Sequence, residues 1–159
     1  MNLETAFTMD TSSIKFGKGV TKEIGSDFKN MGVKRLMICT DNRVAKLSTM
    51  EVVEASLKEV GLEYEIYSGV SVEPTDVSFL EAIDFARKGK FDGYLGVGGG
   101  SSMDTVKAAN LYETYPPEDF LDYVNPPIGK GKPVPGPIKP MICIPTTAGT
   151  GSETTGVAI

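Results

Sequence analysis

The sequence predicts an α/β fold in which a parallel β-sheet is flanked by helices. Two observations support this prediction. Short apolar runs typical of strands alternate with segments whose apolar residues recur at helical spacing, and the connections between them are short. Such alternation implies right-handed crossovers and a parallel sheet covered on both faces. At 159 residues and 40% hydrophobic content, the sequence is long enough for one compact domain, residues 1–159, with its own core.

The first predicted helix follows a short segment, residues 12–16, that we expect to be extended. Its apolar positions recur every three to four residues, as on one buried helix face. They are Val20, Ile24, Phe28 and Met31. Gly32 comes next, and because glycine is common just beyond a helix end, the helix is predicted to end there.

Three strands are predicted from short apolar runs: VKRLMICT at residues 33–40, LEYEIYSG at 62–69 and FDGYLGV at 91–97. Two helices are predicted between them from apolar residues at helical spacing. Val53, Leu57 and Val60 mark the first helix, and Leu80, Ile83 and Ala86 mark the second. These helices are expected to end at Gly61 and near Gly89.

A further helix is predicted from about Ser102 to Tyr112, and then the regular alternation stops. Eight of the ten prolines lie in residues 116–140, which we expect to form either an ordered excursion or a mobile loop. Lys130 and Lys132 within it could reach a phosphate or a substrate carboxylate, but solvated loop charges are the favoured interpretation.

Regular structure is predicted to resume with a strand at MICIPTT, residues 141–147. A glycine-rich loop and a last apolar run, GVAI, follow. Because that run ends without a polar tail, we expect the sequence to be part of a longer chain.

The composition excludes several classes of function. A net charge of −5 disfavours a nucleic-acid surface and a polybasic membrane patch, so the expected ligand is a small molecule. The sequence has no histidine, which excludes a Ser-His-Asp triad, a Cys-His pair and a histidine-ligated metal site within it. Cys39 and Cys143 lie in apolar runs and are expected to be buried hydrophobic residues.

The first twenty residues contain Glu4 and Asp10, no arginine and no apolar stretch. Neither a secretory signal nor a transit peptide is apparent there. We therefore expect a cytoplasmic protein.

The first glycine-rich loop, GVGGGSSMD, lies between a predicted strand and a predicted helix. It contains Gly98, Gly99, Gly100 and Ser101. Glycines let the backbone come close to a ligand, and a helix N-terminus offers unpaired N–H groups and a partial positive charge. The loop is therefore predicted to bind a pyrophosphate. A tight turn with Ser101 as N-cap and Asp104 completing a capping box accounts for the same residues, and the two interpretations are compatible.

A second loop, PTTAGTGSET, follows the strand MICIP and is rich in hydroxyl groups. They belong to Thr146, Thr147, Thr150, Ser152, Thr154 and Thr155. Hydroxyls donate to phosphate or ribose oxygens without adding charge, so this loop is predicted to form the opposite wall of the same ligand site. The alternative is a turn whose hydroxyls satisfy their own backbone.

Two carboxylates accompany these loops. Asp104 would repel a phosphate placed against the first helical turn, which favours a capping role for it. Asp41 ends the first strand, where a carboxylate can accept both hydroxyls of an adenosine ribose and repel a 2′-phosphate, favouring NAD over NADP. A helix cap or turn residue in TDNR is the alternative for Asp41.

The order of these features differs from the dinucleotide-binding fingerprint, in which the glycine loop precedes the acid by about 20 residues. Here Asp41 comes about 57 residues before Gly98, so the fingerprint itself is absent. In a parallel sheet, however, the carboxyl ends of all strands open on one edge. Asp41 and both loops are therefore expected to converge there.

These stretches, in this order and at this spacing, resemble the iron-containing (group III) alcohol dehydrogenase family. The matching motifs are the acid in CTDNR, EPT at residues 73–75, GGGSSMDTVKAAN and PTTAGTGSET. The likeness covers essentially the whole sequence and corresponds to the family's N-terminal, Rossmann-like nucleotide-binding domain. Within the family, DFLDYV, PIGKGKPVPGPIKP and TTAGTGSETTGVAI are most similar to the hydroxyacid-oxoacid transhydrogenase branch.

The resemblance implies a set of roles. Asp41 would contact the adenosine ribose, Gly99, Gly100 and Ser101 the pyrophosphate, and Thr146, Thr147 and Thr150 the nicotinamide side. The family's metal ligands, for Fe²⁺ or Zn²⁺, lie in a helical C-terminal domain beyond residue 159, so this sequence contributes neither metal ligands nor catalytic residues. The chain alone is then expected to bind without turnover, and apolar surface meant for the missing domain could cause self-association.

Two kinds of function remain open from the sequence. The first is the NAD-binding domain of a metal-dependent alcohol dehydrogenase or transhydrogenase acting on an alcohol or hydroxyacid. The second is a non-catalytic module that binds a nucleotide or serves as an interaction unit.

Overall fold

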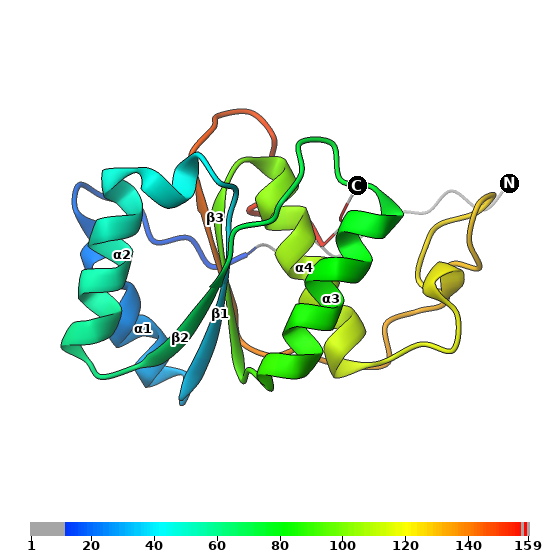
Figure 1. The fold of residues 1–159 in the computed structure, drawn as a ribbon, viewed down its shortest axis with the longest axis horizontal. Coiled ribbons are helices and arrows are strands. Elements are labelled where there is room, and N and C mark those ends of the chain that lie inside the picture. Colours follow the sequence, from blue (N-terminus) through cyan, green and yellow to red (C-terminus); the bar gives the residue numbers. More distant parts are fainter. Residues whose placement is uncertain (1–11, 157, 159) are drawn as a thin grey trace, which may run out of the picture.

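The computed structural model describes residues 12–156 and 158, which form a four-stranded parallel sheet with helices on both faces (Figure 1). The strands are β1 (Arg35–Cys39), β2 (Glu63–Tyr67), β3 (Gly93–Gly98) and β4 (Met141–Pro145). Their order across the sheet is β2-β1-β3-β4, and every neighbouring pair is parallel. The predicted α/β fold is confirmed, including all four strands.

The helices alternate with the strands along the chain. They are η1 (Val20–Glu23), α1 (Ile24–Asn30), η2 (Val44–Lys46), α2 (Ser48–Glu59), α3 (Asp76–Gly89), α4 (Gly100–Thr114) and η3 (Phe120–Asp122), and of these η1 and α1 precede β1. Figure 1 shows α1 and α2 on one face of the sheet and α3 and α4 on the other. The two helix layers are what a parallel sheet needs, because the crossovers of its strands cover both faces.

Strand β1 shows how the sequence builds two cores at once. Leu36 and Ile38 belong to the cluster packed under α1 and α2, whereas Met37 and Cys39 belong to the cluster packed under α3 and α4. Successive side chains of a strand point to opposite faces, so an uninterrupted apolar run fills both layers. All four residues are fully buried.

Several expected features near the surface differ from the prediction. Met31 is 51% exposed, because α1 ends at Asn30 and Met31 lies in the turn that follows, before Gly32 with φ +80°. Leu80 is 46% exposed. Residues 12–16, which were expected to be extended, belong to no helix or strand. The last apolar run, GVAI, includes residues 157 and 159, which lie outside the described part of the chain.

The two cysteines are free thiols in different surroundings. Cys39 is buried, as expected, but Cys143 is only partly buried because β4 is an edge strand of the described sheet. Burial raises the pKa of both thiols, that of Cys143 to about 11. Both are therefore protonated at neutral pH.

The proline-rich segment, residues 116–140, is an ordered excursion that projects beyond α4 (Figure 1). The Tyr112 ring packs against those of Phe120 and Tyr123, each at 5.3 Å between centroids, and its hydroxyl donates to Phe120 O at 2.7 Å. Where the chain returns to the sheet, Asn110 on α4 donates to Lys139 O and accepts from Lys139 N. This double contact fixes the start of β4.

Lys130 and Lys132 are exposed but are not simply solvated loop charges, as the sequence had suggested. Their ammonium nitrogens lie 2.7 and 3.0 Å from the carboxylate oxygens of Asp122, whose side chain is 2% exposed. Lys132 N also donates to Asp122 O at 2.8 Å. The two lysines therefore close the excursion on one buried carboxylate, and they are occupied there rather than directed at a ligand.

This pairing makes the excursion sensitive to acid. Hydrogen bonds from Lys130 and then Lys132 lower the pKa of Asp122 from its ordinary 3.8 to about 2. A carboxyl group with a depressed pKa stabilises the fold above its unfolded pKa, and that stabilisation is lost as the pH falls through the folded value. We expect Asp122→Asn to lower the free energy of unfolding above about pH 4, and the difference from the wild type to shrink towards about pH 2. Urea unfolding across that range measures it, and a difference that does not vary with pH would contradict the assignment.

Candidate functional site

The carboxyl ends of the strands meet at one edge of the sheet and border a hollow of about 350 Å³. Six of the residues predicted to bind a cofactor line it: Asp41, Gly99, Gly100, Ser101, Thr146 and Thr147. They come from the segments that follow β1, β3 and β4. The predicted convergence is therefore present, and the hollow is in the size range of small-molecule sites.

The first glycine-rich loop brings backbone, not side chains, to this hollow. Gly98 has φ +151°, which favours glycine, and a Cβ atom placed there would lie 2.4 Å from Ser102 Oγ. Gly99 is the N-cap of the 15-residue helix α4, with no side-chain cap. The N-terminal end of α4 therefore faces the hollow with its backbone N–H groups and partial positive charge, a suitable arrangement for an anion.

The capping interpretation of this loop is wrong. The N-cap is Gly99 rather than Ser101, which places Ser101 inside α4 and Asp104 in its second turn. A capping box requires the N-cap side chain and a residue three positions later, so Asp104 is too far along the helix to complete one. Asp104 is instead buried and forms an ion pair with Lys107, with 3.2 Å between Oδ1 and Nζ. It does not line the hollow.

The second loop lies against the first. Thr146 N donates to Gly98 O at 2.8 Å, continuing the pairing of β3 with β4. A Cβ atom on Gly99 would lie 3.2 Å from Thr147 Oγ1, and one on Gly100 would lie 3.3 Å from Ser152 Oγ and 3.4 Å from Thr150 Cγ2. Thr150 and Ser152 thus support the glycine loop from the side rather than lining the hollow.

The hydroxyls of the second loop differ in their contacts, and that of Thr155 accepts from Lys107 Nζ at 3.3 Å. Thr154 Oγ1 donates to Gly151 O at 3.0 Å and Thr150 Oγ1 accepts from Ser152 N at 3.4 Å, as expected for a turn that satisfies its own backbone. Thr146 and Thr147 are exposed, and within residues 12–156 and 158 their hydroxyls form no hydrogen bond. These two hydroxyls therefore remain available to a ligand in the hollow.

Asp41 has the turn role that the sequence offered as the alternative, and it also lines the hollow. Its Oδ1 accepts from Arg43 N at 2.8 Å and from Val44 N at 3.0 Å, which makes it a turn residue before η2. Its Oδ2 lies 3.8 Å from the position that a Cβ atom on Gly98 would take. One carboxylate oxygen thus holds the turn, and the other faces the glycine loop.

Sequence reasoning missed part of the lining. Arg43, together with Val70, Ser71 and Val72 from the segment after β2, borders the same hollow. The rule that strand carboxyl ends share one edge could have identified the β2 segment, because β2 pairs with β1. The EPT motif at residues 73–75 has a structural role here, since Thr75 caps α3 in a capping box with Ser78.

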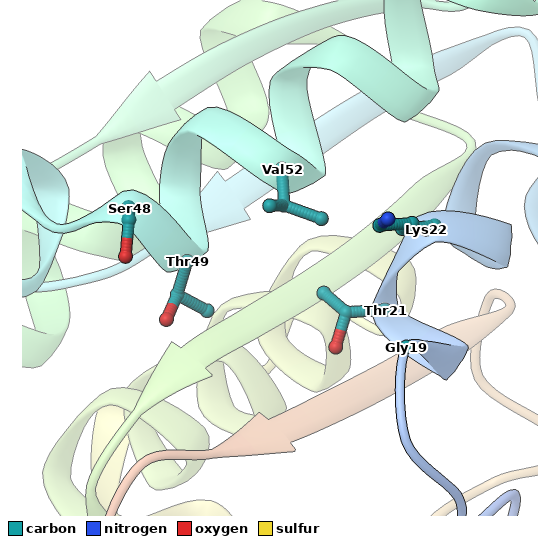
Figure 2. Close-up of a pocket in the computed structure, with 6 residues that line it drawn as sticks. All are labelled: Gly19, Thr21, Lys22, Ser48, Thr49 and Val52. Carbon is teal, nitrogen blue, oxygen red and sulfur yellow. The ribbon is translucent and has the colours of Figure 1, made fainter.

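Another hollow, of about 230 Å³, lies between η1 and α2 (Figure 2). Thr21 and Lys22 face Thr49 and Val52 across it. Neither glycine-rich loop borders it. We therefore place the candidate site at the carboxyl edge of the sheet.

Among residues 12–156 and 158, no group of three histidine, cysteine, aspartate or glutamate side chains is placed to hold a metal ion. None of the helices in this part of the chain is long and apolar enough to cross a membrane.

Comparison with known proteins identifies close relatives. The chain is 58% identical over 154 residues to the mitochondrial hydroxyacid-oxoacid transhydrogenase of Mus musculus and 59% identical to that of Homo sapiens. Each alignment covers 97% of this chain and 33% of the relative. The chain therefore spans about a third of the length of these relatives, and the similarity to the transhydrogenase branch is confirmed.

The expected cytoplasmic location is wrong as far as these relatives show, because their names place them in mitochondria. The expectation rested on finding no leader in the first twenty residues. In a sequence that spans a third of its relatives, such an absence carries no information about the compartment.

A solved structure and a family model both relate this chain to the alcohol dehydrogenases. The NADH-dependent butanol dehydrogenase A of Thermotoga maritima superposes with a TM-score of 0.84 at 29% identity, covering 95% of this chain and 37% of that protein. The family model for iron-containing alcohol dehydrogenase matches residues 11–159. The chain therefore belongs to the iron-containing alcohol dehydrogenase family.

Proposed function

We propose that this chain is the NAD-binding region of a hydroxyacid-oxoacid transhydrogenase, a protein that passes a hydride between a hydroxyacid and an oxoacid. The observation that carries the proposal is the meeting of Asp41 and both glycine-rich loops around one hollow. The names of the relatives support the reaction, and through them we also propose a mitochondrial location. An alcohol dehydrogenase that acts on a simple alcohol is the alternative within the family.

The residues of the hollow fit the parts of a dinucleotide. The pyrophosphate would lie against Gly99 and Gly100, where a side chain would fill the space between the loops and where the N-terminus of α4 offers backbone donors. The adenosine ribose would lie at Asp41, and the nicotinamide side would lie towards Thr146 and Thr147. When bound, the nicotinamide supplies the group that accepts or gives the hydride.

The metal of the family does not fit the described part of this chain, which offers no set of ligands for it. We propose that Fe²⁺ or Zn²⁺ is held by a helical domain beyond residue 159, consistent with relatives about three times as long. On its own, the chain would therefore bind the cofactor without turning over substrate. In this chain alone, the apolar surface that would contact the helical domain is exposed. We therefore also propose that the chain forms a homo-oligomer through this surface.

The test is calorimetric titration of the folded chain with NAD, for the wild type and for Asp41→Asn. Asparagine keeps an oxygen that can accept from Arg43 N and Val44 N, so the turn is retained while the charge is removed. Hydrogen bonds to a charged group are worth about 1.5–3 kcal/mol, so we expect saturable NAD binding by the wild type and about tenfold weaker binding by the variant. A folded chain that binds no NAD would overturn the proposed function.

A further inference from the structure

Arg43 lies in the candidate site but has no role in the scheme above. It lines the hollow together with Asp41, and they are the only charged residues among those that border it in the described part of the chain. Its backbone N–H donates to Asp41 Oδ1 at 2.8 Å, which fixes the two residues on one turn. The hollow is therefore bordered by one negative and one positive side chain.

Within the described part of the chain, the guanidinium group of Arg43 is not bound to any other residue. Its side chain is exposed and, within residues 12–156 and 158, forms no hydrogen bond or ion pair. The other two arginines are engaged: Arg35 pairs with Glu63 at 3.2 Å and also with Glu65, and Arg87 donates to Tyr112 O at 3.4 Å. An arginine that borders a ligand hollow and stabilises nothing nearby is available to an anionic group of the ligand.

The chemistry of that anionic group follows from the position of Arg43. In dinucleotide sites an acid at a strand end binds the 2′-hydroxyl of the adenosine ribose, and a nearby arginine accommodates a 2′-phosphate. Asp41 alone would repel that phosphate, but Arg43 supplies a compensating charge two residues away. A guanidinium group also presents a planar pair of donors that matches the geometry of a phosphate.

We propose that Arg43 determines cofactor specificity and lets this site accept the 2′-phosphorylated dinucleotide NADP as well as NAD. This inference rests on the proposed function, because it presupposes that a dinucleotide occupies the hollow. It goes beyond the expectation from Asp41 alone, which was a preference for NAD.

The test compares NAD and NADP binding by the folded chain in the wild type, Arg43→Ala and Lys46→Ala. Lys46 is a matched control, since it is an exposed cation in the η2 turn that does not line the hollow. We expect Arg43→Ala to weaken NADP binding by about tenfold or more and NAD binding by less than about threefold, because only NADP carries the 2′-phosphate. Lys46→Ala should leave both affinities within about twofold of the wild type.

The outcomes separate this inference from the proposed function. If the wild type binds NAD but not NADP, only this inference fails. The same holds if Arg43→Ala weakens the binding of both cofactors equally, or of neither, because Arg43 then does not determine specificity. If the wild type binds neither dinucleotide, the proposed function fails together with it.

Discussion

Replacing Gly99 with valine is expected to weaken NAD binding by about a hundredfold, or roughly 2.7 kcal/mol, while the fold remains intact. At Gly99 the first loop lies against Thr147 of the second loop. A Cβ atom there would lie 3.2 Å from Thr147 Oγ1 and 3.7 Å from Thr147 Cγ2. The two methyl groups of valine would occupy the space that we propose for the pyrophosphate at the N-terminus of α4.

The fold should tolerate this change. Gly99 has φ −81° and ψ −171°, an extended conformation that β-branched residues readily adopt. The neighbouring Thr147 is exposed and can move aside. Valine is a poorer N-cap than glycine, which should cost about 1 kcal/mol of helix stability.

The measurement is calorimetric titration with NAD alongside thermal unfolding of the same chains. Gly156→Val serves as the matched control, because it adds the same side chain near the second loop where a Cβ atom meets nothing within 4 Å. The control should bind like the wild type. Retained NAD affinity in a folded Gly99→Val chain would show that the pyrophosphate lies elsewhere.

The elements of the fold were predictable because burial follows the apolar pattern closely. In β1 every second residue faces the same core, so one short run specified a strand covered on both sides. The pattern was less reliable for α3, where Leu80 is exposed while Ser78 and Ala82 are buried. Small residues form the buried face of α3 because this helix packs against α4. Serine and alanine are at most weakly apolar, so a hydrophobicity pattern does not mark their positions as buried.

The site was predictable to the extent that it depends on strand ends. Asp41 and the two loops follow strands of a parallel sheet, so their meeting at one edge required no further information. The position of Arg43 depends on how the turn after β1 is closed, by hydrogen bonds to Asp41 Oδ1 that the sequence does not reveal. The error on Asp104 came from predicting the start of α4 two residues too late. Asp104 was therefore expected to cap the helix, whereas it forms a buried ion pair with Lys107.

A second glycine, Gly96, received no role from the sequence but has one in the structure. It lies in the middle of β3, paired in register with Cys39 of β1 and Cys143 of β4. A Cβ atom on Gly96 would lie 2.8 Å from Val106 Cγ1 and 3.4 Å from Met103 Cα. The absence of a side chain therefore sets how closely α4 packs on the sheet, and so where its N-terminus lies relative to the candidate site.

We expect Gly96→Ala to lower the free energy of unfolding by about 1–3 kcal/mol, because the added methyl group overpacks a buried interface. In the Gly96→Ala and Val106→Ala double variant, the close contact with Val106 Cγ1 is removed. The double variant should therefore lose about 1 kcal/mol less than the sum of the single losses. Urea unfolding of the four chains gives this coupling energy.

The control for this cycle pairs Gly96→Ala with Val33→Ala, since Val33 contacts the position of a Cβ atom on Gly93 but not on Gly96. Those two losses should add within about 0.5 kcal/mol. Additive losses for Gly96 and Val106 as well would mean that α4 moves away from the sheet as a whole when a methyl group is added. In that case Gly96→Ala should also weaken NAD binding, because the N-terminus of α4 would move with the helix, whereas a purely local repacking at Val106 would leave NAD binding unchanged.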